Sequence, residues 1–306
     1  MDAISAETSL PIAAIDCENG IRGMHDIPAT AERQRLIDLY EREYLVLQAD
    51  RAERRRAAHR LRYQVYCLEN PFEESAAYPD GLECDEFDDH AVQSLLQRRV
   101  DGAAIGTVRL ILPVEGRAGD SLPFQRLCRP IVPLLDLLLP VDTMAEVSRF
   151  CISKELRRRP AIHGSGAEPA RRVASLSRYA TLGLIRSLVE NSIDHGVTHW
   201  CLVVEPALMR FLASLGLQFH PLGPLVEHHG LRQPCHADLA TLLDGVREQR
   251  PDVWEVITDE GRLALSGTTR PDRRQALRPM ATRQAVRSRP DSIGAAGLTV
   301  GELAVA

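Results

Sequence analysis

The sequence predicts an α/β (α+β) fold in which one mixed central sheet carries helices on both faces. Two observations support this class. Strand-like segments first follow one another directly, as in an antiparallel meander, and a strand–helix–strand segment then predicts a parallel crossover. The chain has 306 residues, of which 44% are hydrophobic, so it is long enough to bury a sizeable core.

The first half predicts a strand, a helix and a hairpin. Residues 42–49 alternate between apolar and polar side chains, as a half-buried strand does. Residues 50–70 predict a helix with Asp50 as its N-cap. The apolar residues of this helix fall on one stripe: Ala57, Leu61, Val65 and Leu68. Residues 91–99 and 104–113 predict two strands joined by a tight turn, which together form a hairpin.

The second half predicts a proline- and leucine-rich loop, followed by strands and helices that alternate. In chain order these are a loop at 122–142, a strand at 144–153, a helix at 170–196, a strand at 200–206, a helix at 206–216 and two strands after residue 217. Gly196 and Gly216 stand at the ends of the two helices, where glycine is the preferred C-cap. The longer helix and its flanking strands form the predicted crossover.

We expect three regions in the chain. Residues 1–30 predict a flexible N-terminal arm, residues 31–265 one folded domain, and residues 266–306 a disordered, arginine-rich C-terminal tail. The chain starts with acidic residues, unlike a secretory signal, and has no run of roughly 18–20 apolar residues. We therefore expect a cytoplasmic protein without an integral membrane segment. Seven cysteines without CxxC spacing predict free thiols.

The composition disfavours several functions. Aromatic residues make up only 5% of the chain and basic residues interleave with acidic ones, so we expect no nucleic-acid partner. No GxGxxG, GxxxxGK or GxSxG motif is present. Five candidate metal ligands have a spacing that matches no zinc pattern, so we expect no metal. They are His220, His228, His229, Cys235 and His236.

The segment ECDEFD, residues 83–88, concentrates like charges. On an extended segment Glu83 and Asp85 share one face, and Asp88 is expected to begin the next strand. Such repulsion requires cations nearby. Three arginines interrupt otherwise apolar segments and can supply them: Arg62, Arg109 and Arg149. Together these residues predict a charged pocket, and the alternative is that each arginine lies on a solvated face.

Four ordered motifs carry a resemblance to a known family: LRYQVY (61–66), ECDEFD (83–88), GTVRL (106–110) and AEVSRF (145–150). The chain resembles the acyl-homoserine-lactone autoinducer synthases and the N-acyl amino acid synthases. It resembles above all the LuxI-like acyltransferases associated with exosortase (PEP-CTERM) systems, also at residues 250–263. The resemblance implies a GNAT-like acyltransferase fold for the folded domain.

The same resemblance implies an activity. An N-acyltransferase of this kind moves a fatty acyl group from an acyl-carrier-protein thioester, or from acyl-CoA, to the amine of an amino acid or derivative. Its partners would be an acyl carrier protein and a small-molecule amine acceptor, without a tightly bound cofactor. Two alternatives stay open: an acyl-homoserine-lactone synthase that uses S-adenosylmethionine, and a non-catalytic module that binds an acyl group or a carrier protein.

The resemblance also assigns residues to the site. Glu146 is the expected base, acting through water, and Arg149, Asp85 and Asp88 complete the expected catalytic set. The expected substrate-binding residues are Arg62, Tyr66, Glu83, Arg109, Ser148 and Phe150. A backbone N–H of residues 146–150 is expected to stabilise the oxyanion. The alternative role for Glu146 and Arg149 is a structural ion pair.

One segment departs from the pattern of GNAT enzymes that use coenzyme A. Those enzymes bind the pyrophosphate with a Q/R-x-x-G-x-G/A loop at a helix N-terminus. The corresponding segment here is 157–172, in which Ala161 takes the place of the Q/R. The departure favours a carrier protein as the donor. Two basic runs, Arg157–Arg159 and Arg171–Arg172, are expected either to contact an acidic carrier protein or to form a solvated loop.

Overall fold

A mixed β-sheet forms the centre of the structure, a computed structural model that describes residues 40–130, 135–154, 167–228 and 230–263. The strands lie in the order β1-β2-β3-β4-β5-β8-β6, and β7 pairs with β8 at Leu231 and Arg232. Their bounds are β1 Tyr44–Gln48, β2 Ala91–Arg98, β3 Ala104–Ile111, β4 Met144–Ile152, β5 His199–Val204, β6 His220–Pro221, β7 Val226–Glu227 and β8 Leu231–Asp238. The arrangement confirms the predicted mixed sheet.

The sheet opens between its two central strands. Strands β1 to β4 pair antiparallel in succession, whereas β4 and β5 run parallel. In the described chain β4 pairs with β5 at Met144, Ala145 and Glu146, and β5 continues along β8 up to Val204. The backbone of β4 therefore separates from β5 after Glu146, and a space opens between the two strands from that residue on.

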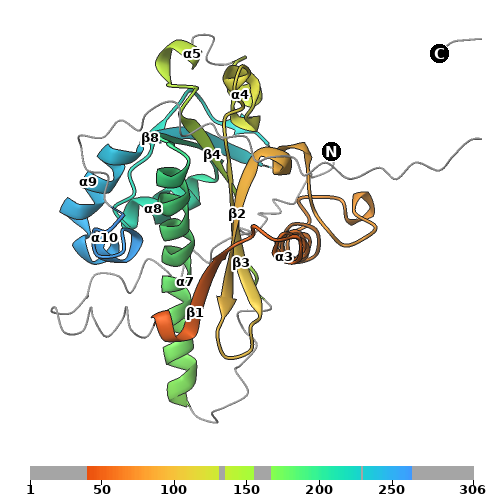
Figure 1. Cartoon of the computed structure of the whole chain (residues 1–306), viewed down its shortest axis with the longest axis vertical. Coiled ribbons are helices and arrows are strands. Elements are labelled where there is room, and N and C mark those ends of the chain that lie inside the picture. Colours follow the sequence, from red (N-terminus) through yellow and green to blue (C-terminus); the bar gives the residue numbers. More distant parts are fainter. Residues whose placement is uncertain (1–39, 131–134, 155–166, 229, 264–306) are drawn as a thin grey trace, which may run out of the picture.

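Helices cover both faces of the sheet. One face carries α3 (Ala52–Tyr63), α4 (Pro123–Cys128) and the short α5 (Leu135–Leu138). The other face carries α7 (Ala167–Asp194), α8 (Pro206–Ser214), α9 (Leu239–Gln249) and α10 (Pro251–Ile257). Figure 1 shows α3 and α7 on opposite sides of β2 and β3. Alternation along β2 explains this arrangement, because Leu95 packs with α3 and Leu96 packs in the core beside α7.

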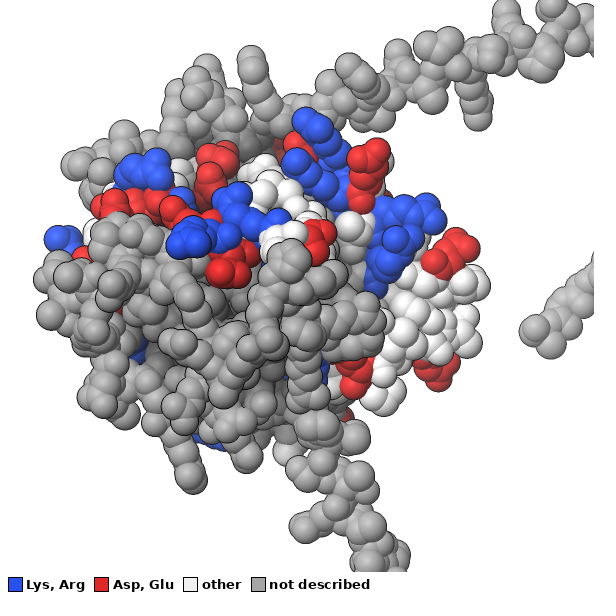
Figure 2. Space-filling view, turned by 90° about the horizontal axis from the view of Figure 1, so that it is seen from below, with Lys and Arg blue, Asp and Glu red and all other residues white. Residues whose placement is uncertain are grey.

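The α7 face holds the larger apolar core. Leu184, Ile185 and Leu188 of α7 pack there with Val108 of β3 and Trp200 of β5. Within the described ranges, none of the helices is long and apolar enough to cross a membrane. Among the described residues that are visible in Figure 2, basic side chains lie beside acidic ones.

Several sequence predictions were wrong in detail. The helix expected at 50–70 ends as an α-helix at Tyr63 and continues as a π-helical turn, which leaves Leu68 56% exposed instead of on the apolar stripe. Its N-cap is Arg51, not Asp50. The expected loop at 122–142 contains α4 and α5, and the sequence reading missed α9 and α10. The expected arm (1–30) and tail (266–306) lie outside the described residues.

Candidate active site

The acidic segment is shaped by local hydrogen bonds, not by an extended strand. Residues Glu86–His90 form a short 3-10 helix, so Asp88 precedes β2, contrary to the expectation that it begins that strand. The Asp85 carboxylate accepts a hydrogen bond from the Phe87 N–H (2.9 Å), and the Asp88 carboxylate accepts one from the Asp85 N–H (2.8 Å). This reciprocal capping box holds both carboxylates on one side of the turn.

Two buried arginines from different elements meet these carboxylates. Arg62 of α3 is paired with Glu83 and with Asp88, the latter at 2.6 Å. Arg109 of β3 is paired with Asp85 at 2.6 Å and with Asp88 at 2.9 Å. Both arginines are at most 1% exposed, so each charge depends on its partners for stabilisation. Asp88 bridges the two arginines and ties α3 to β3.

A third arginine, Arg149, reaches the network because β4 contains a bulge. Thr107 pairs with Cys151 and Arg109 pairs with Ser148, so two residues of β4 lie opposite the single residue between Thr107 and Arg109. Arg149 has φ of 49°, which is uncommon for a residue with a side chain. The bulge breaks the regular alternation of side chains along β4. As a result, the Arg149 guanidinium points towards the acidic segment.

The contacts of Arg149 link the network to the opening in the sheet. Its guanidinium lies 2.9 Å from Glu83, 3.3 Å from Glu73 and 3.6 Å from Asp85. It also lies over the Tyr66 ring, at 5.3 Å from the ring centre. Burial acts to raise the pKa of Glu83, but the hydrogen bond from Arg62 and the charge of Arg149 outweigh it and lower the pKa to about 2. The carboxylate of Glu83 is therefore ionised at neutral pH.

Glu146 is in a different environment from the other carboxylates. It is 6% exposed and occupies the last position at which β4 pairs with β5. Its Oε2 accepts a hydrogen bond from the Phe124 N–H of α4 at 2.7 Å. Burial raises the pKa of this carboxyl to about 7, although the Phe124 hydrogen bond and the charge of Arg109 act to lower it. A carboxyl with this pKa can take up and release a proton near neutral pH.

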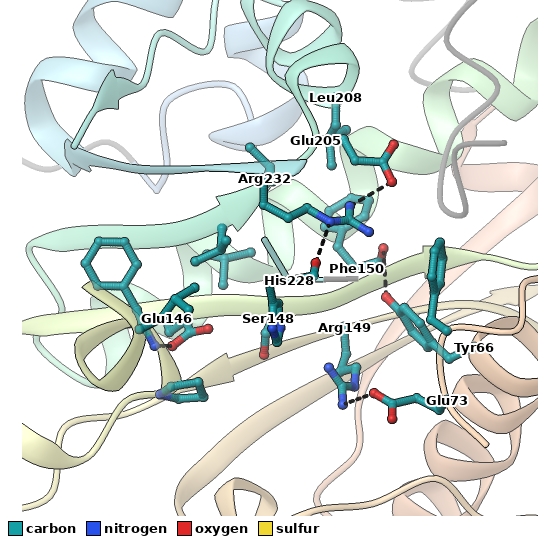
Figure 3. Close-up of a pocket in the computed structure, with 17 residues that line it drawn as sticks. Tyr66, Glu73, Glu146, Ser148, Arg149, Phe150, Glu205, Leu208, His228 and Arg232 are labelled. Atoms are coloured by element: carbon teal, nitrogen blue, oxygen red, sulfur yellow. Dashed lines mark hydrogen bonds and ion pairs between the residues drawn. The ribbon is translucent and has the colours of Figure 1, made fainter. Parts of the chain in front are cut away.

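Two cavities meet at the opening between β4 and β5. The larger has a volume of about 200 Å³ and the smaller about 60 Å³. Four apolar residues line both cavities: Val147, Phe150, Val204 and Leu208. The larger cavity has polar walls that include Glu146 and Ser148, which Figure 3 shows along β4. The smaller is lined by apolar side chains only and extends towards α7 and α8.

The structure brings the expected site residues together in two layers. Five of them line the larger cavity: Tyr66, Glu146, Ser148, Arg149 and Phe150. The other five form the charged layer behind it: Arg62, Glu83, Asp85, Asp88 and Arg109. A direct bond joins the layers, because Arg109 Nε donates to Ser148 Oγ at 3.0 Å. The bonds described for Glu146 and Arg149 go to different partners, Phe124 for the former and acidic residues for the latter.

Sequence reasoning missed several residues of the cavity wall. Glu73 follows the π-helical turn, Glu205 follows β5, and Arg232 lies in β8. None of them belongs to the motifs that carry the resemblance. A signal was present only for Glu205, because the Pro206 that starts α8 marks the end of a central strand, where ligands commonly bind.

Two further predictions from the sequence concern the contacts with a carrier protein and the absence of a metal site. Residues 157–166 lie outside the described chain, as do the side chains of Arg171 and Arg172, so the expected carrier-protein contacts stay predictions. Of the candidate metal ligands, His220 and His236 have ring centres 5.8 Å apart. In the part of the chain that the structure covers, no three His, Cys, Asp or Glu side chains gather as a metal site requires.

Comparisons with known proteins identify the class of the domain. The family model described as "Acetyltransferase (GNAT) domain" matches residues 61–165, a segment that includes Tyr66, the acidic segment and Glu146. This match and the mixed sheet with helices on both faces show a GNAT-like acyltransferase fold. The fold of the chain is thus GNAT-like, as the sequence motifs imply.

Solved structures with a similar fold include acyl-homoserine lactone synthases and an N-acyl amino acid synthase. The AHL synthase LasI is 20% identical, with a TM-score of 0.44 over 63% of this chain and 88% of LasI. FeeM, an N-acyl amino acid synthase from uncultured soil microbes, is 17% identical, with a TM-score of 0.47 over 67% of this chain and 96% of FeeM. BjaI, a CoA-dependent acyl-homoserine lactone synthase, is 19% identical, with a TM-score of 0.45 over 72% and 89% of the two chains.

Proposed function

We propose that this protein transfers an acyl group from a thioester to the amine of an amino acid or an amino acid derivative. The observation that carries the proposal is the position of Glu146. Its carboxyl lines the cavity where β4 leaves β5, and its pKa is raised to about 7. A base with this pKa is largely ionised at slightly alkaline pH and can accept the proton of an attacking amine.

The reaction requires two bonds to change at the thioester carbon. The amine nitrogen attacks the carbonyl carbon while Glu146, directly or through a water, accepts the proton that the nitrogen loses. The C–S bond then breaks, the thiolate leaves and takes up a proton, and an amide remains. Beyond Glu146, β4 has separated from β5, so backbone N–H groups of β4 on that side are candidates to stabilise the oxyanion.

The smaller cavity suits the apolar tail of the acyl group. It is lined by apolar side chains from β4, β5, α7 and α8, among them Val147, Leu202, Leu188 and Leu212. Because the two cavities share wall residues, a thioester carbonyl near Glu146 can place its alkyl chain in the smaller cavity. Removing alkyl surface from water contributes about 0.8 kcal/mol for each buried CH₂ group.

In this proposal the charged layer positions the residues that contact substrate. Arg109 holds the Ser148 hydroxyl, and the acidic partners of Arg149 hold that guanidinium at the cavity wall. The Tyr66 hydroxyl donates to the Phe150 carbonyl at 3.4 Å, which links the π-helical turn to β4 beside the cavity. Asp85 and Asp88 would then act by ordering the segment around them, because both are paired with arginines.

The acyl donor, the cellular location and the associated system are proposed from the sequence. We propose an acyl carrier protein as the donor, with acyl-CoA as the alternative, and a cytoplasmic location. We also propose an association with an exosortase system. The departure at Ala161 from the coenzyme A loop favours the carrier protein.

A direct assay tests the function. The purified full chain is given the same acyl group on a carrier protein or on coenzyme A, together with a panel of amino acids. Free thiol that is released only when an amine is present, with an N-acyl amino acid detected by mass spectrometry, supports the proposal. Release of methylthioadenosine from S-adenosylmethionine would indicate a lactone synthase. Thioester binding without turnover would indicate a non-catalytic module.

A further inference from the structure

The two oxygens of the Glu146 carboxyl have different surroundings. Oε2 accepts the Phe124 N–H of α4 at 2.7 Å, whereas Oε1 accepts no hydrogen bond from the part of the chain that the structure describes. Figure 3 shows the Glu146 side chain at the cavity, with the bond to α4 as a dashed line. The direction of the Phe124 N–H therefore determines how the carboxyl is turned within the cavity.

The helix that carries this N–H begins without an ordinary cap. Leu122 occupies the N-cap position of α4, and its apolar side chain cannot accept hydrogen bonds from the first N–H groups. Gln125 reaches backwards instead, and its Oε1 accepts from the N–H groups of Ser121 and Leu122, both at 3.0 Å. Its Nε2 donates to the Ala118 carbonyl at 2.7 Å. One side chain thus connects the backbone segment that leads into α4.

The burial of Gln125 makes these three bonds necessary. Its exposed fraction is 0%, so its amide cannot exchange them for bonds to bulk water. A buried amide without partners is costly, whereas one that makes its hydrogen bonds is tolerated. Both polar atoms of Gln125 have partners, and all of these partners are backbone groups. The side chain therefore serves to order the backbone of this segment.

The bonds of Gln125 orient the peptide groups that come just before Phe124. The N–H groups of Ser121 and Leu122 belong to two successive planar peptide groups, which the bonds to Gln125 hold in place. Pro123 follows, and its ring restricts φ to about −65°. The next peptide group carries the Phe124 N–H, so its direction depends on the groups before it. Without the glutamine, two buried N–H groups would lose their partners and the start of α4 would reorient.

We propose that Gln125 is a positioning residue for the proposed reaction, because it holds the Phe124 N–H against Glu146 Oε2 and leaves Oε1 to take the proton of the amine. This inference rests on the proposed role of Glu146 as the base. The Phe124 bond is stronger for the carboxylate than for the neutral carboxyl, so it opposes burial, which raises the pKa of Glu146 to about 7. Gln125 thereby helps to keep the base ionised at slightly alkaline pH.

The test compares pH–rate profiles of wild type and Gln125→Met in the thiol-release assay. Methionine has a similar length but cannot form the three amide bonds, so the Phe124 bond to Glu146 should be weakened or lost. A hydrogen bond to a charged group corresponds to roughly one to two pH units, so the inflection near pH 7 should move upwards by up to this amount. The variant should be slow at neutral pH and recover most of its rate above the new inflection.

Asn191→Leu is the matched control, because it also removes a buried amide. Asn191 is 1% exposed, bonds to Gln48 and Ser94, and lines neither cavity. This variant should lose stability and keep the inflection near pH 7. A purely structural role for Gln125 would lower the rate of Gln125→Met by the same factor at every pH, with the inflection unchanged. That result would overturn the proposal.

An infrared titration tests the inference even if no amine is acylated. Infrared difference spectra detect protonation of a buried carboxyl, and the signal that is missing in Glu146→Gln identifies Glu146. An upward shift of its midpoint in Gln125→Met supports the inference when the proposed reaction fails. Gln125→Asn is the second variant if Gln125→Met does not fold, because its amide is one methylene shorter, and it should shift the midpoint in the same direction. Equal midpoints in wild type and the folded variant refute the inference.

Discussion

Replacing Glu146 by glutamine removes one buried negative charge and keeps an oxygen that can accept the Phe124 hydrogen bond. If Glu146 is the base, Glu146→Gln should lower kcat by roughly 10²- to 10⁴-fold, the usual contribution of a general base. The wild-type pH–rate profile should contain an inflection near pH 7, because burial raises the pKa of Glu146 to about 7. The variant should lack this inflection, whatever the amine itself contributes to the profile.

The same substitution should make the protein more stable. The folded-state pKa of Glu146 lies above its ordinary value of 4.5, so folding favours the protonated form. The stability that the protonated Glu146 carboxyl contributes is fully present below pH 4.5. It is lost as the pH rises through about 7, because the buried carboxylate must then ionise. The pKa rises from 4.5 to about 7, so at about 1.4 kcal/mol per pKa unit the ionised carboxylate costs the fold about 3.5 kcal/mol at alkaline pH.

Thermal unfolding at two pH values measures this effect. For a domain of this size about 1 kcal/mol shifts Tm by roughly 2–4 °C, so Glu146→Gln should raise Tm by up to roughly 7–14 °C at pH 8. Near pH 5 the gain should largely disappear, because the wild-type carboxyl is then neutral as well. Glu190→Gln, an exposed change on α7, is the control and should alter neither rate nor Tm. A variant with normal turnover, or one less stable than wild type at pH 8, would refute the reasoning about Glu146.

Four further predictions follow from the same geometry. Arg109→Ala should destabilise the fold by about 3–5 kcal/mol, because it leaves Asp85 without this buried partner, and limited proteolysis should then cut within residues 83–89; an unchanged digestion pattern would contradict the pairing. Glu83 has a lowered pKa of about 2, so its stabilising contribution is present above pH 4.5 and should be lost as the pH falls towards 2, which circular dichroism during acid titration can detect. Leu208→Trp narrows the wall shared by both cavities and should raise KM for long acyl donors more than for short ones in the thiol-release assay; equal effects on both would count against the acyl cavity. The Tyr40 hydroxyl is buried without a hydrogen-bond partner in the described structure, so Tyr40→Phe should stabilise the protein by about 1 kcal/mol in urea unfolding, and a loss of stability would show that the hydroxyl has a partner.

Local patterns were sufficient for most of the fold. Residues 42–49, 91–99 and 104–113 could be predicted as the strands β1, β2 and β3 because the hydrophobic pattern of a strand is a property of neighbouring residues. The helices α9 and α10 were missed although α9 has a regular apolar face and an Asp238 N-cap that bonds the Thr241 N–H at 2.8 Å. The apolar face and the N-cap of α9 are local features, so the sequence does contain the signals that predict this helix.

The charged residues of the site could be recognised before their contacts were known. A buried arginine requires a partner, so Arg62, Arg109 and Arg149 in apolar segments predicted carboxylates nearby, and the acidic segment supplies them. The sequence did not predict which of the expected site residues line the cavity and which form the charged layer behind it. It depends on the bulge at Arg149 and on the 3-10 helix at Glu86–His90, which arise from strand register and backbone hydrogen bonds.

By itself the sequence determined where the central strands and the helices α3, α7 and α8 form and which charged side chains must be paired, because periodicity and charge are carried by each segment of the chain. Only the tertiary structure decided that Glu146 lies at the last shared position of β4 and β5, and that Arg232 reaches the same cavity as Tyr66. A proton affinity depends on how completely surrounding segments exclude water, and a cavity wall depends on which distant segments meet. Both are properties of the folded chain and of no single stretch within it.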